Sequence, residues 1–176
     1  FGSVDVCINL AYPKSITWGE SFEDISIEQI SHHLNLQLGT CILLSQRFMK
    51  YFVSRGKGNL VLLSSIQGVA APKFDHYEGT NMSSPIEYTA AKTGIIGITK
   101  WLAKYCKNKN IRVNCISPGG ILHNQNKSFL KKYNSSCLSK GMLDPNDLSG
   151  TIKFLISEDS EFINGQNIVI DDGWTL

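Results

Sequence analysis

A tyrosine and a lysine, Tyr88 and Lys92, stand four residues apart in a stretch that otherwise reads as a small-residue helix. On a helix, residues at this spacing share one face, so the phenol and the ammonium are expected to lie together. A phenol with a reference pKa of about 10 exchanges protons poorly at neutral pH unless something stabilises its anion. A positive charge about 4 Å away, at an effective dielectric near 20, contributes at most about 4 kcal/mol, or up to about three pKa units. We therefore expect Lys92 to lower the pKa of Tyr88 toward working pH.

Ser65 is a candidate partner of this pair, because Ser64 and Ser65 directly follow a buried apolar run. A Ser65 hydroxyl would hold the substrate oxygen while Tyr88 takes or gives the proton, with hydride transfer to a nicotinamide ring balancing the charge. The plain alternative is a half-buried Tyr88 and a solvated Lys92, which describes most Tyr-x-x-x-Lys pairs taken alone. For Ser65 the plain alternative is a hydroxyl that caps a turn.

Four short runs rich in Val, Ile and Leu have the pattern of parallel strands buried on both faces. They cover residues 4–8, 60–63, 111–116 and 168–170. With helices between them, the order β-α-β-α-β-α-β predicts an α/β fold, a Rossmann-like parallel sheet with flanking helices. Ligand sites in such sheets lie beyond the carboxyl ends of the strands. Ser65 and Pro118-Gly119 both follow strands there, and the helix of Tyr88 begins near the same edge.

Three helical patterns fill the connections. The first covers 26–54 and opens with Ser26 and Gln29 in a capping-box arrangement. The last begins at Asp144-Pro145, an N-cap followed by a proline at the first helical position, and runs to about residue 156. The middle helix carries Tyr88 and has an apolar face and a small-residue stripe that suits close approach by another helix. The apolar face comprises Ala91, Ile95, Ile98 and Leu102, and the stripe comprises Ala90, Gly94 and Gly97.

Composition excludes several classes of function. Hydrophobic residues make up 42% and no apolar run is long enough to cross a bilayer, so we expect no membrane span. Lys and Arg number 17 against 15 Asp and Glu, without a basic tract, so a nucleic-acid partner is not expected. The five cysteines are odd in number and form no Cys-x-x-Cys pair, which is typical of reduced thiols in a cytoplasmic protein.

Metal ligation is not predicted either. His76 has no second ligand at metal spacing. His32 and His33 point to different helix faces and are expected to be solvated.

Taken together and in this order, the motifs resemble the short-chain dehydrogenase/reductase family over essentially all 176 residues. The resemblance rests on Asn9-Leu10-Ala11-Tyr12, Ser64-Ser65-Ile66-Gln67-Gly68, Tyr88-Thr89-Ala90-Ala91-Lys92, Arg112 to Gly119, and Ile163-Asn164-Gly165-Gln166 leading to Asp171-Asp172-Gly173. It implies that Tyr88 is the catalytic acid/base, that Lys92 lowers its pKa and binds the nicotinamide ribose, and that Ser65 orients the reacting carbonyl or hydroxyl.

The resemblance also implies NAD or NADP as cofactor, without distinguishing the two. Pro118, Gly119 and the backbone near Ile121 would flank the nicotinamide, and Asn9 and Ala11 would flank the adenosine side. The stretches "EYTAAKTGIIG", "NCISPGGIL" and "INGQNIVIDDGW" are similar to bacterial short-chain oxidoreductases found with flagellin-glycan and nonulosonic-acid biosynthesis.

Several positions depart from the family pattern. The family's fourth catalytic residue is an asparagine, whose place falls on Gln37, while Asn35 lies two residues earlier. Gln37 offers the same amide chemistry, and Asn35 in a locally distorted helix remains an alternative. Leu10 and Tyr12 replace an asparagine and a glycine, and Tyr12 is expected to form part of the cleft wall.

The connection between Ser65 and Tyr88 is longer than usual in the family. Its stretch "PKFDHYEGTNMSSPIE" is expected to form a substrate-side loop. The polar and aromatic set in this loop would suit a hydroxylated, sugar-like substrate: Asp75, His76, Tyr77 and Asn81.

No glycine-rich phosphate loop occurs at a strand-to-helix turn in this sequence. We therefore interpret residues 1–176 as the second half of a Rossmann-fold domain, lacking the N-terminal βαβ phosphate-binding half. Because the first residue is Phe1, we expect a segment upstream to be absent. Such a sheet would expose an apolar edge beside 4–8, so the 176 residues alone are expected to be unstable and not to bind dinucleotide.

The leading functional hypothesis is an NAD(P)-dependent oxidoreductase acting on a secondary alcohol or ketone, with a sugar derivative as one candidate substrate. A non-catalytic scaffold or regulatory subunit and a nucleotide-sugar epimerase or dehydratase remain alternatives. The small-residue stripe at Ala90, Gly94 and Gly97 further suggests a homodimer or homotetramer.

Overall fold

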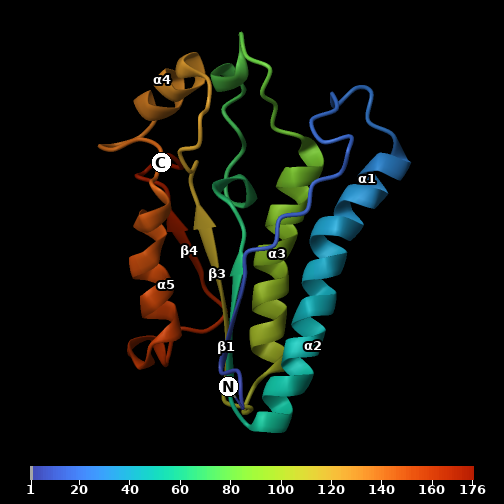
Figure 1. Ribbon diagram of the computed structural model, residues 1–176, viewed down its shortest axis with the longest axis vertical. Helices are drawn as coiled ribbons and strands as arrows, with labels where there is room; N and C mark the ends of the chain where they lie inside the picture. Colours follow the sequence, from blue (N-terminus) through green and yellow to red (C-terminus); the bar gives the residue numbers. More distant parts are fainter. Residues whose placement is uncertain (1) are drawn as a thin grey trace.

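In the computed structural model, which describes residues 2–176, a parallel sheet stands between layers of helices (Figure 1). The sheet has four strands in the order β1-β2-β3-β4. Their bounds are Val6–Asn9 for β1, Gly58–Leu63 for β2, Ile111–Pro118 for β3 and Asn167–Ile170 for β4. The predicted α/β class, the parallel pairing and the approximate place of each strand are confirmed.

The helices follow the predicted connections with one addition. Their bounds are Ile27–Leu34 for α1, Thr40–Arg55 for α2, Ile86–Tyr105 for α3, Lys127–Ser135 for α4 and Ser149–Ile156 for α5. The capping box at Ser26 is present, but the predicted helix over 26–54 is divided by a π-helical segment, Asn35–Gly39. Asp144 caps a 3-10 helix, Pro145–Leu148, that leads into α5, so the last helix is α-helical only from Ser149. The additional helix is α4, which lies at the carboxyl end of the sheet (Figure 1).

Alternate residues of the central strands face different helix layers. Leu60 and Leu62 of β2 are fully buried against α2 and α3, together with Val113 and Cys115 of β3. Val61 between them faces the other way and packs with Ile116 and Leu155 of α5. Burying such a side chain on each face contributes roughly 2 kcal/mol, so both layers hold the sheet.

The connection from β3 to β4 has the opposite hand to the two before it. The strand order advances in one direction throughout, yet α2 and α3 lie on one face and α5 on the other (Figure 1). Because about 98% of parallel crossovers are right-handed, a change of hand within one sheet is unusual. It lets four consecutive strands be covered on both faces.

The small-residue stripe of α3 meets another helical segment within the same chain. A Cβ added to Gly94 would lie 2.8 Å from the side chain of Leu38, in the π-helical segment Asn35–Gly39 that joins α1 to α2. Close approach by another helix is thus confirmed at Gly94. Ala90 and Gly97 are exposed, so the stripe is only partly covered.

No helix within residues 2–176 is both long enough and apolar enough to cross a membrane. All five cysteines are free thiols.

Asn114 holds β3 to the segment that leads into β4. Its side chain is fully buried and donates to the Ile163 carbonyl at 2.7 Å, while accepting from the Gln166 amide at 3.0 Å. Both bonds satisfy backbone groups that would otherwise lack a partner.

We predict that Asn114→Leu lowers the free energy of unfolding of the full-length protein by about 2 to 4 kcal/mol, because two backbone groups lose their partner. Urea denaturation measures this change. Gln166→Ala is the matched control, since it keeps the backbone amide and should stay within about 0.5 kcal/mol of the parent. Equal stability of the two variants would contradict the role of Asn114.

Candidate active site

The start of α3 is docked against the carboxyl end of β2. The Ser64 hydroxyl donates to the Lys92 carbonyl at 2.7 Å. A Cβ on Gly68 would lie 2.8 Å from the same carbonyl group, so only glycine allows this approach. Ser65 is buried, and its hydroxyl accepts from the Gln67 amide at 3.2 Å, capping the short helix Ile66–Gly68. Ser65 therefore caps a turn and also lies next to the start of α3.

Lys92 is buried rather than solvated, with only 3% of its surface exposed. Its Nζ donates to the Leu63 carbonyl at 3.1 Å and lies 5.6 Å from the centre of the Tyr88 ring. An ammonium has three N–H donors, and the Leu63 carbonyl is its only hydrogen-bond partner among residues 2–176. Two donors are therefore left beside Tyr88.

Burial lowers the pKa of Lys92 to about 8, with small opposing effects from Cys115 and Cys41. Burial also raises the pKa of Tyr88, against the effect of a hydrogen bond with Ser65. The expectation that Lys92 lowers the Tyr88 pKa is wrong for this structure. Burial disfavours the charged phenolate more than the surrounding groups stabilise it, so the pKa of Tyr88 rises. The Lys92 ammonium donates its hydrogen bond to the Leu63 carbonyl.

Aromatic rings from the loop after β1 cover this pair. The ring of Tyr12 packs edge-on against Tyr88, with centroids 5.6 Å apart, and the Lys92 Nζ lies 5.1 Å from the Tyr12 centroid. Trp18 meets both tyrosines in the same manner, at 5.5 Å and 5.6 Å. Tyr12 thus forms the predicted wall, and it explains much of the burial of Tyr88.

Gln37 and Asn35 differ clearly in position. Gln37 is 4% exposed, and its side-chain amide donates to the Pro13 carbonyl, next to Tyr12. Asn35 is exposed, and its side chain lies over Gly39 on the outer surface. Both belong to the π-helical segment, a distortion that often marks functional sites. Of the two, Gln37 is the residue that faces inward toward the Tyr88 cluster.

The residues predicted on the cofactor side lie at the same edge of the sheet. The Asn9 side chain accepts from the Ala11 amide at 3.1 Å, which shapes the turn after β1. Pro118 ends β3, and the Gly119 amide continues the ladder to the Ile170 carbonyl at 2.7 Å. Ile121 follows, in a short parallel bridge with Leu143.

His33 lies behind the Trp18 ring and was missed by the sequence analysis, which placed it in solvent. It is 1% exposed, and the centroids of the two rings are 5.0 Å apart. Neither ring nitrogen has a hydrogen-bond partner in the described chain, nor does Oε2 of Glu87, which is also buried. Burial lowers the pKa of His33, and Glu87 opposes this effect. Only the fold shows that His33, unlike His32, faces inward.

The long loop between Ser65 and Tyr88 is less exposed to solvent than its polar composition suggested. His76 is 3% exposed, accepts or donates at 3.1 Å with the Ser136 hydroxyl, and is enclosed by aromatic rings, so it is not a surface contact for substrate. Asp75 and Asn81 are exposed. Tyr77 is half-buried, and it is one of the groups that raise the pKa of Tyr88.

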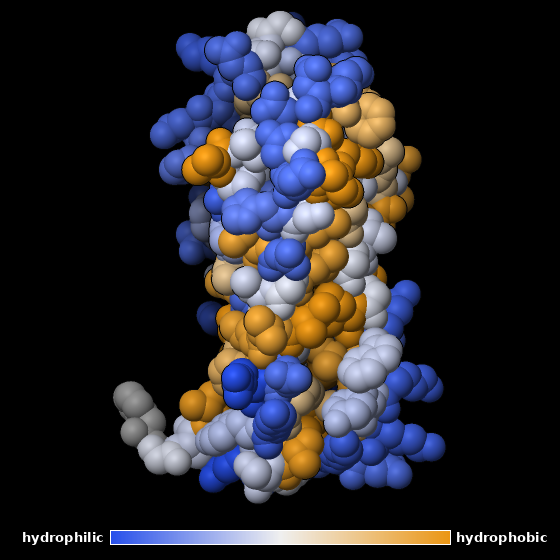
Figure 2. All heavy atoms as spheres, turned by 90° about the vertical axis from the view of Figure 1, so that its right-hand side faces the viewer, coloured by the Kyte–Doolittle hydropathy of each residue, from blue (hydrophilic) through white to orange (hydrophobic). Residues whose placement is uncertain are grey.

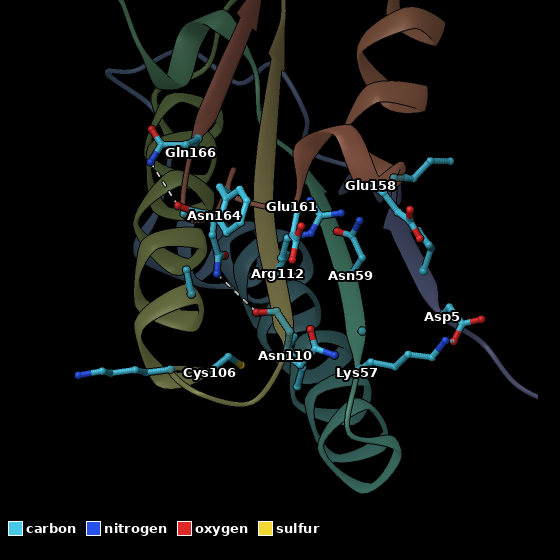
Figure 3. Close-up of a pocket in the computed structure, with 18 of the residues that line it drawn as sticks. Asp5, Lys57, Asn59, Cys106, Asn110, Arg112, Glu158, Glu161, Asn164 and Gln166 are labelled. Atoms are coloured by element: carbon cyan, nitrogen blue, oxygen red, sulfur yellow. Dashed lines mark hydrogen bonds and ion pairs between the residues drawn. The ribbon is translucent and has the colours of Figure 1, made fainter.

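A cavity of about 1340 Å³ opens at the opposite end of the sheet (Figure 3). It is lined by polar residues at the starts of the strands, including Asp5, Lys57 and Arg112. Arg112 is already bonded to Ser160 at 2.8 Å and to the Ser157 carbonyl at 3.1 Å. None of the predicted site residues lines this cavity, so we do not assign the chemistry to it.

Comparison with known proteins agrees with the motifs. A short-chain dehydrogenase model described as enoyl-(acyl carrier protein) reductase matches residues 1–175. Post-translational flagellin modification protein A of Campylobacter coli is 49% identical over 177 residues, which cover all of this chain and 69% of that protein. The 7alpha-hydroxysteroid dehydrogenase of Bacteroides fragilis is 32% identical over 181 residues, covering all of this chain and 66% of that one.

Among solved structures, a short-chain dehydrogenase from Leptospira borgpetersenii with bound NAD+ superimposes with a TM-score of 0.89. The two are 38% identical, and the match covers 98% of this chain and 65% of the other. The chain therefore spans about two thirds of the length of these relatives.

We predict that one lysine of the cofactor-free full-length protein titrates near pH 8, where Lys92 passes from charged to neutral as the pH rises. Carbon-13 NMR of labelled lysine side chains measures this, and the resonance should be missing in Lys92→Met. Lys100→Met, at an exposed position of the same helix, should keep it. An Lys92 resonance that titrates at an ordinary value of about 10.4 would contradict the buried environment.

Proposed function

The chain belongs to the short-chain dehydrogenase/reductase family, and we propose that its protein is an NAD(P)-dependent oxidoreductase that interconverts a secondary alcohol and a ketone. The observation that carries this proposal is the convergence of Ser65, Tyr88 and Lys92 at the carboxyl edge of β2. Residues 1–176 would then be the second, catalytic part of a Rossmann-fold domain.

In the proposed reaction, the Ser65 hydroxyl binds the oxygen of the substrate and Tyr88 exchanges the proton with it. Tyr88 is a proton donor in the resting site, because its raised pKa keeps the phenol protonated at neutral pH. That state suits ketone reduction. Alcohol oxidation would require the phenolate form of Tyr88, which burial of the phenol disfavours. A bound nicotinamide supplies or accepts the hydride.

The residues present fit a nicotinamide ribose. Lys92 keeps two N–H donors beside Tyr88, and hydroxyl groups are suitable acceptors for them. Pro118, Gly119 and Ile121 would border the nicotinamide, and Asn9 and Ala11 the adenosine side. Because Tyr12 covers the Lys92 ammonium, the Tyr12 ring would have to turn aside for the ribose. Gln37 would occupy the fourth catalytic position in place of Asn35, because it alone of the two faces inward.

The bound NAD+ in the Leptospira relative supports a nicotinamide dinucleotide without choosing NAD over NADP here. The similarity to a flagellin modification protein supports a sugar derivative of surface-glycan biosynthesis as the substrate. Free thiols at all five cysteines agree with a cytoplasmic location.

We predict that Tyr88→Phe lowers kcat/KM of the full-length protein for sugar alcohols by about 10² to 10⁴-fold, because proton transfer is lost. Nicotinamide absorbance measures the rate. Tyr105→Phe removes a hydroxyl from an exposed position of the same helix and should keep the parent rate.

An unchanged rate in Tyr88→Phe would contradict the oxidoreductase proposal. Absence of any turnover by the parent would favour a non-catalytic scaffold. Product formed without net change in NAD(P)H would favour an epimerase or dehydratase.

We also propose that the protein is a homodimer or homotetramer that associates through the groove between α2 and α3. This groove has a volume of about 730 Å³ and is lined mainly by apolar residues. Ile42, Val53 and Trp101 are 51%, 45% and 63% exposed there. Figure 2 shows hydrophobic side chains gathered along this side of the molecule. The stripe at Ala90, Gly94 and Gly97 is less suited, since Leu38 already covers Gly94.

We predict that Trp101→Glu lowers the mass of the full-length assembly, because a charge would be buried in the apolar contact. Light scattering measures the mass. Lys100→Glu changes an adjacent exposed position outside this groove and should leave the mass unchanged. An unchanged mass in Trp101→Glu would exclude this face.

A further inference from the structure

A polar network stands beside the proposed reacting groups and is not used by the mechanism above. The side-chain amide of Gln67 donates from Nε2 to the Tyr77 hydroxyl at 3.1 Å. Its Oε1 accepts from the Ser84 hydroxyl at 2.6 Å. Gln67 begins the connection from β2 to α3, Tyr77 lies in its middle and Ser84 near its end. The network therefore ties three parts of the connection between β2 and α3 together.

The Tyr77 hydroxyl is held in place from behind. The Tyr77 ring packs on Phe129 of α4, with centroids 5.1 Å apart. The neighbouring His76 is anchored to the same helical region through the Ser136 hydroxyl, at 3.1 Å. A phenol fixed in this way loses little further freedom when it binds a ligand.

The network also borders the reacting centre. Gln67 is joined to Ser65 through the bond from its backbone amide to the Ser65 hydroxyl, at 3.2 Å. The Tyr77 hydroxyl is bonded to the side chain of that same Gln67, at 3.1 Å. A substrate oxygen held between Ser65 and Tyr88 would thus have Tyr77 on its flank.

Donors in this network remain available. The oxygen of Tyr77 accepts from Gln67, and the Ser84 hydroxyl is a further hydrogen-bond partner of Tyr77, so a ligand oxygen would compete with Ser84 for the hydrogen of the Tyr77 hydroxyl. The second Nε2 hydrogen of Gln67 has no hydrogen-bond acceptor among residues 2–176. No lysine or arginine is recorded as a partner of Gln67, Tyr77 or Ser84 in the described chain. Neutral donors that have no cationic hydrogen-bond partner suit an uncharged hydroxyl better than a carboxylate.

We propose that Tyr77 donates a hydrogen bond to a second hydroxyl of the substrate, close to the reacting carbon. Gln67 and Ser84 act as positioning residues for Tyr77. The site would then prefer polyols and hydroxy ketones to simple alcohols and ketones. This inference rests on the proposed oxidoreductase function and adds to it the residue that would recognise a second hydroxyl of the substrate.

Two four-carbon alcohols, meso-2,3-butanediol and 2-butanol, test the inference on the full-length protein, because they differ only in the second hydroxyl. With NAD+ and NADP+ offered in turn, we expect a higher kcat/KM for the diol. Tyr77→Phe should lower kcat/KM for the diol by about three- to tenfold and leave 2-butanol unchanged, since one neutral hydrogen bond is lost.

Ser84→Ala should raise KM for the diol more than it lowers kcat, because Tyr77 is held less firmly. Ser83→Ala, at the neighbouring exposed position, is the matched control and should keep the parent preference. The thermal midpoint of each variant reports on folding, and unchanged midpoints assign the effect to binding.

Equal kcat/KM for the two alcohols in the parent, or an unchanged preference in Tyr77→Phe, overturns this inference and leaves the oxidoreductase proposal standing. Turnover of neither alcohol counts against both. Turnover that survives Tyr88→Phe counts against the oxidoreductase proposal, whatever the preference for the diol.

Discussion

The candidate site depends on how one residue of α3 is joined to the end of β2. The backbone carbonyl of Lys92 accepts from Ser64, and the Lys92 ammonium donates to the carbonyl of Leu63. These two partners are consecutive, and Ser65 follows them. Because Tyr88 lies one helical turn before Lys92, the two bonds set the position of the phenol relative to the serine. Gly68 allows the helix to come this close.

Much of this arrangement could be predicted from the sequence, because it follows from local patterns. Buried parallel strands are continuous apolar runs, and their carboxyl ends meet at one edge, so Ser65 and Pro118-Gly119 could be placed together. The capping box at Ser26 has a fixed spacing and was equally readable. Helix α4 was not predicted, because it is short and mostly polar, and only Phe129 and Tyr133 are buried.

Burial of single polar groups could not be predicted, because it depends on which distant segment covers them. His32 and His33 are neighbours with the same side chain, yet only His33 is enclosed, by Trp18. The pKa of Tyr88 was expected to fall because its neighbour at the next turn is a lysine, and it rises because the phenol is buried. Rings from the loop after β1 cover that phenol. The sequence pattern of α3 gives no sign of those rings, because they belong to another segment.

The three strand pairs of the sheet join residues at nearly the same distance along the chain. Val6 pairs with Asn59, Val61 with Asn114 and Cys115 with Asn167, which are separations of 53, 53 and 52 residues. Because loop closure costs nearly the same entropy in each case, the change of hand before β4 does not by itself delay that strand in folding. Helix α4, which backs the Tyr77 ring, lies in the last of these connections, whereas Ser65 and Tyr88 lie in the one before it. The groups that would perform the chemistry and the wall that would choose the substrate thus come from separate crossover segments, and a change of sequence in the second segment can alter the wall without altering the first.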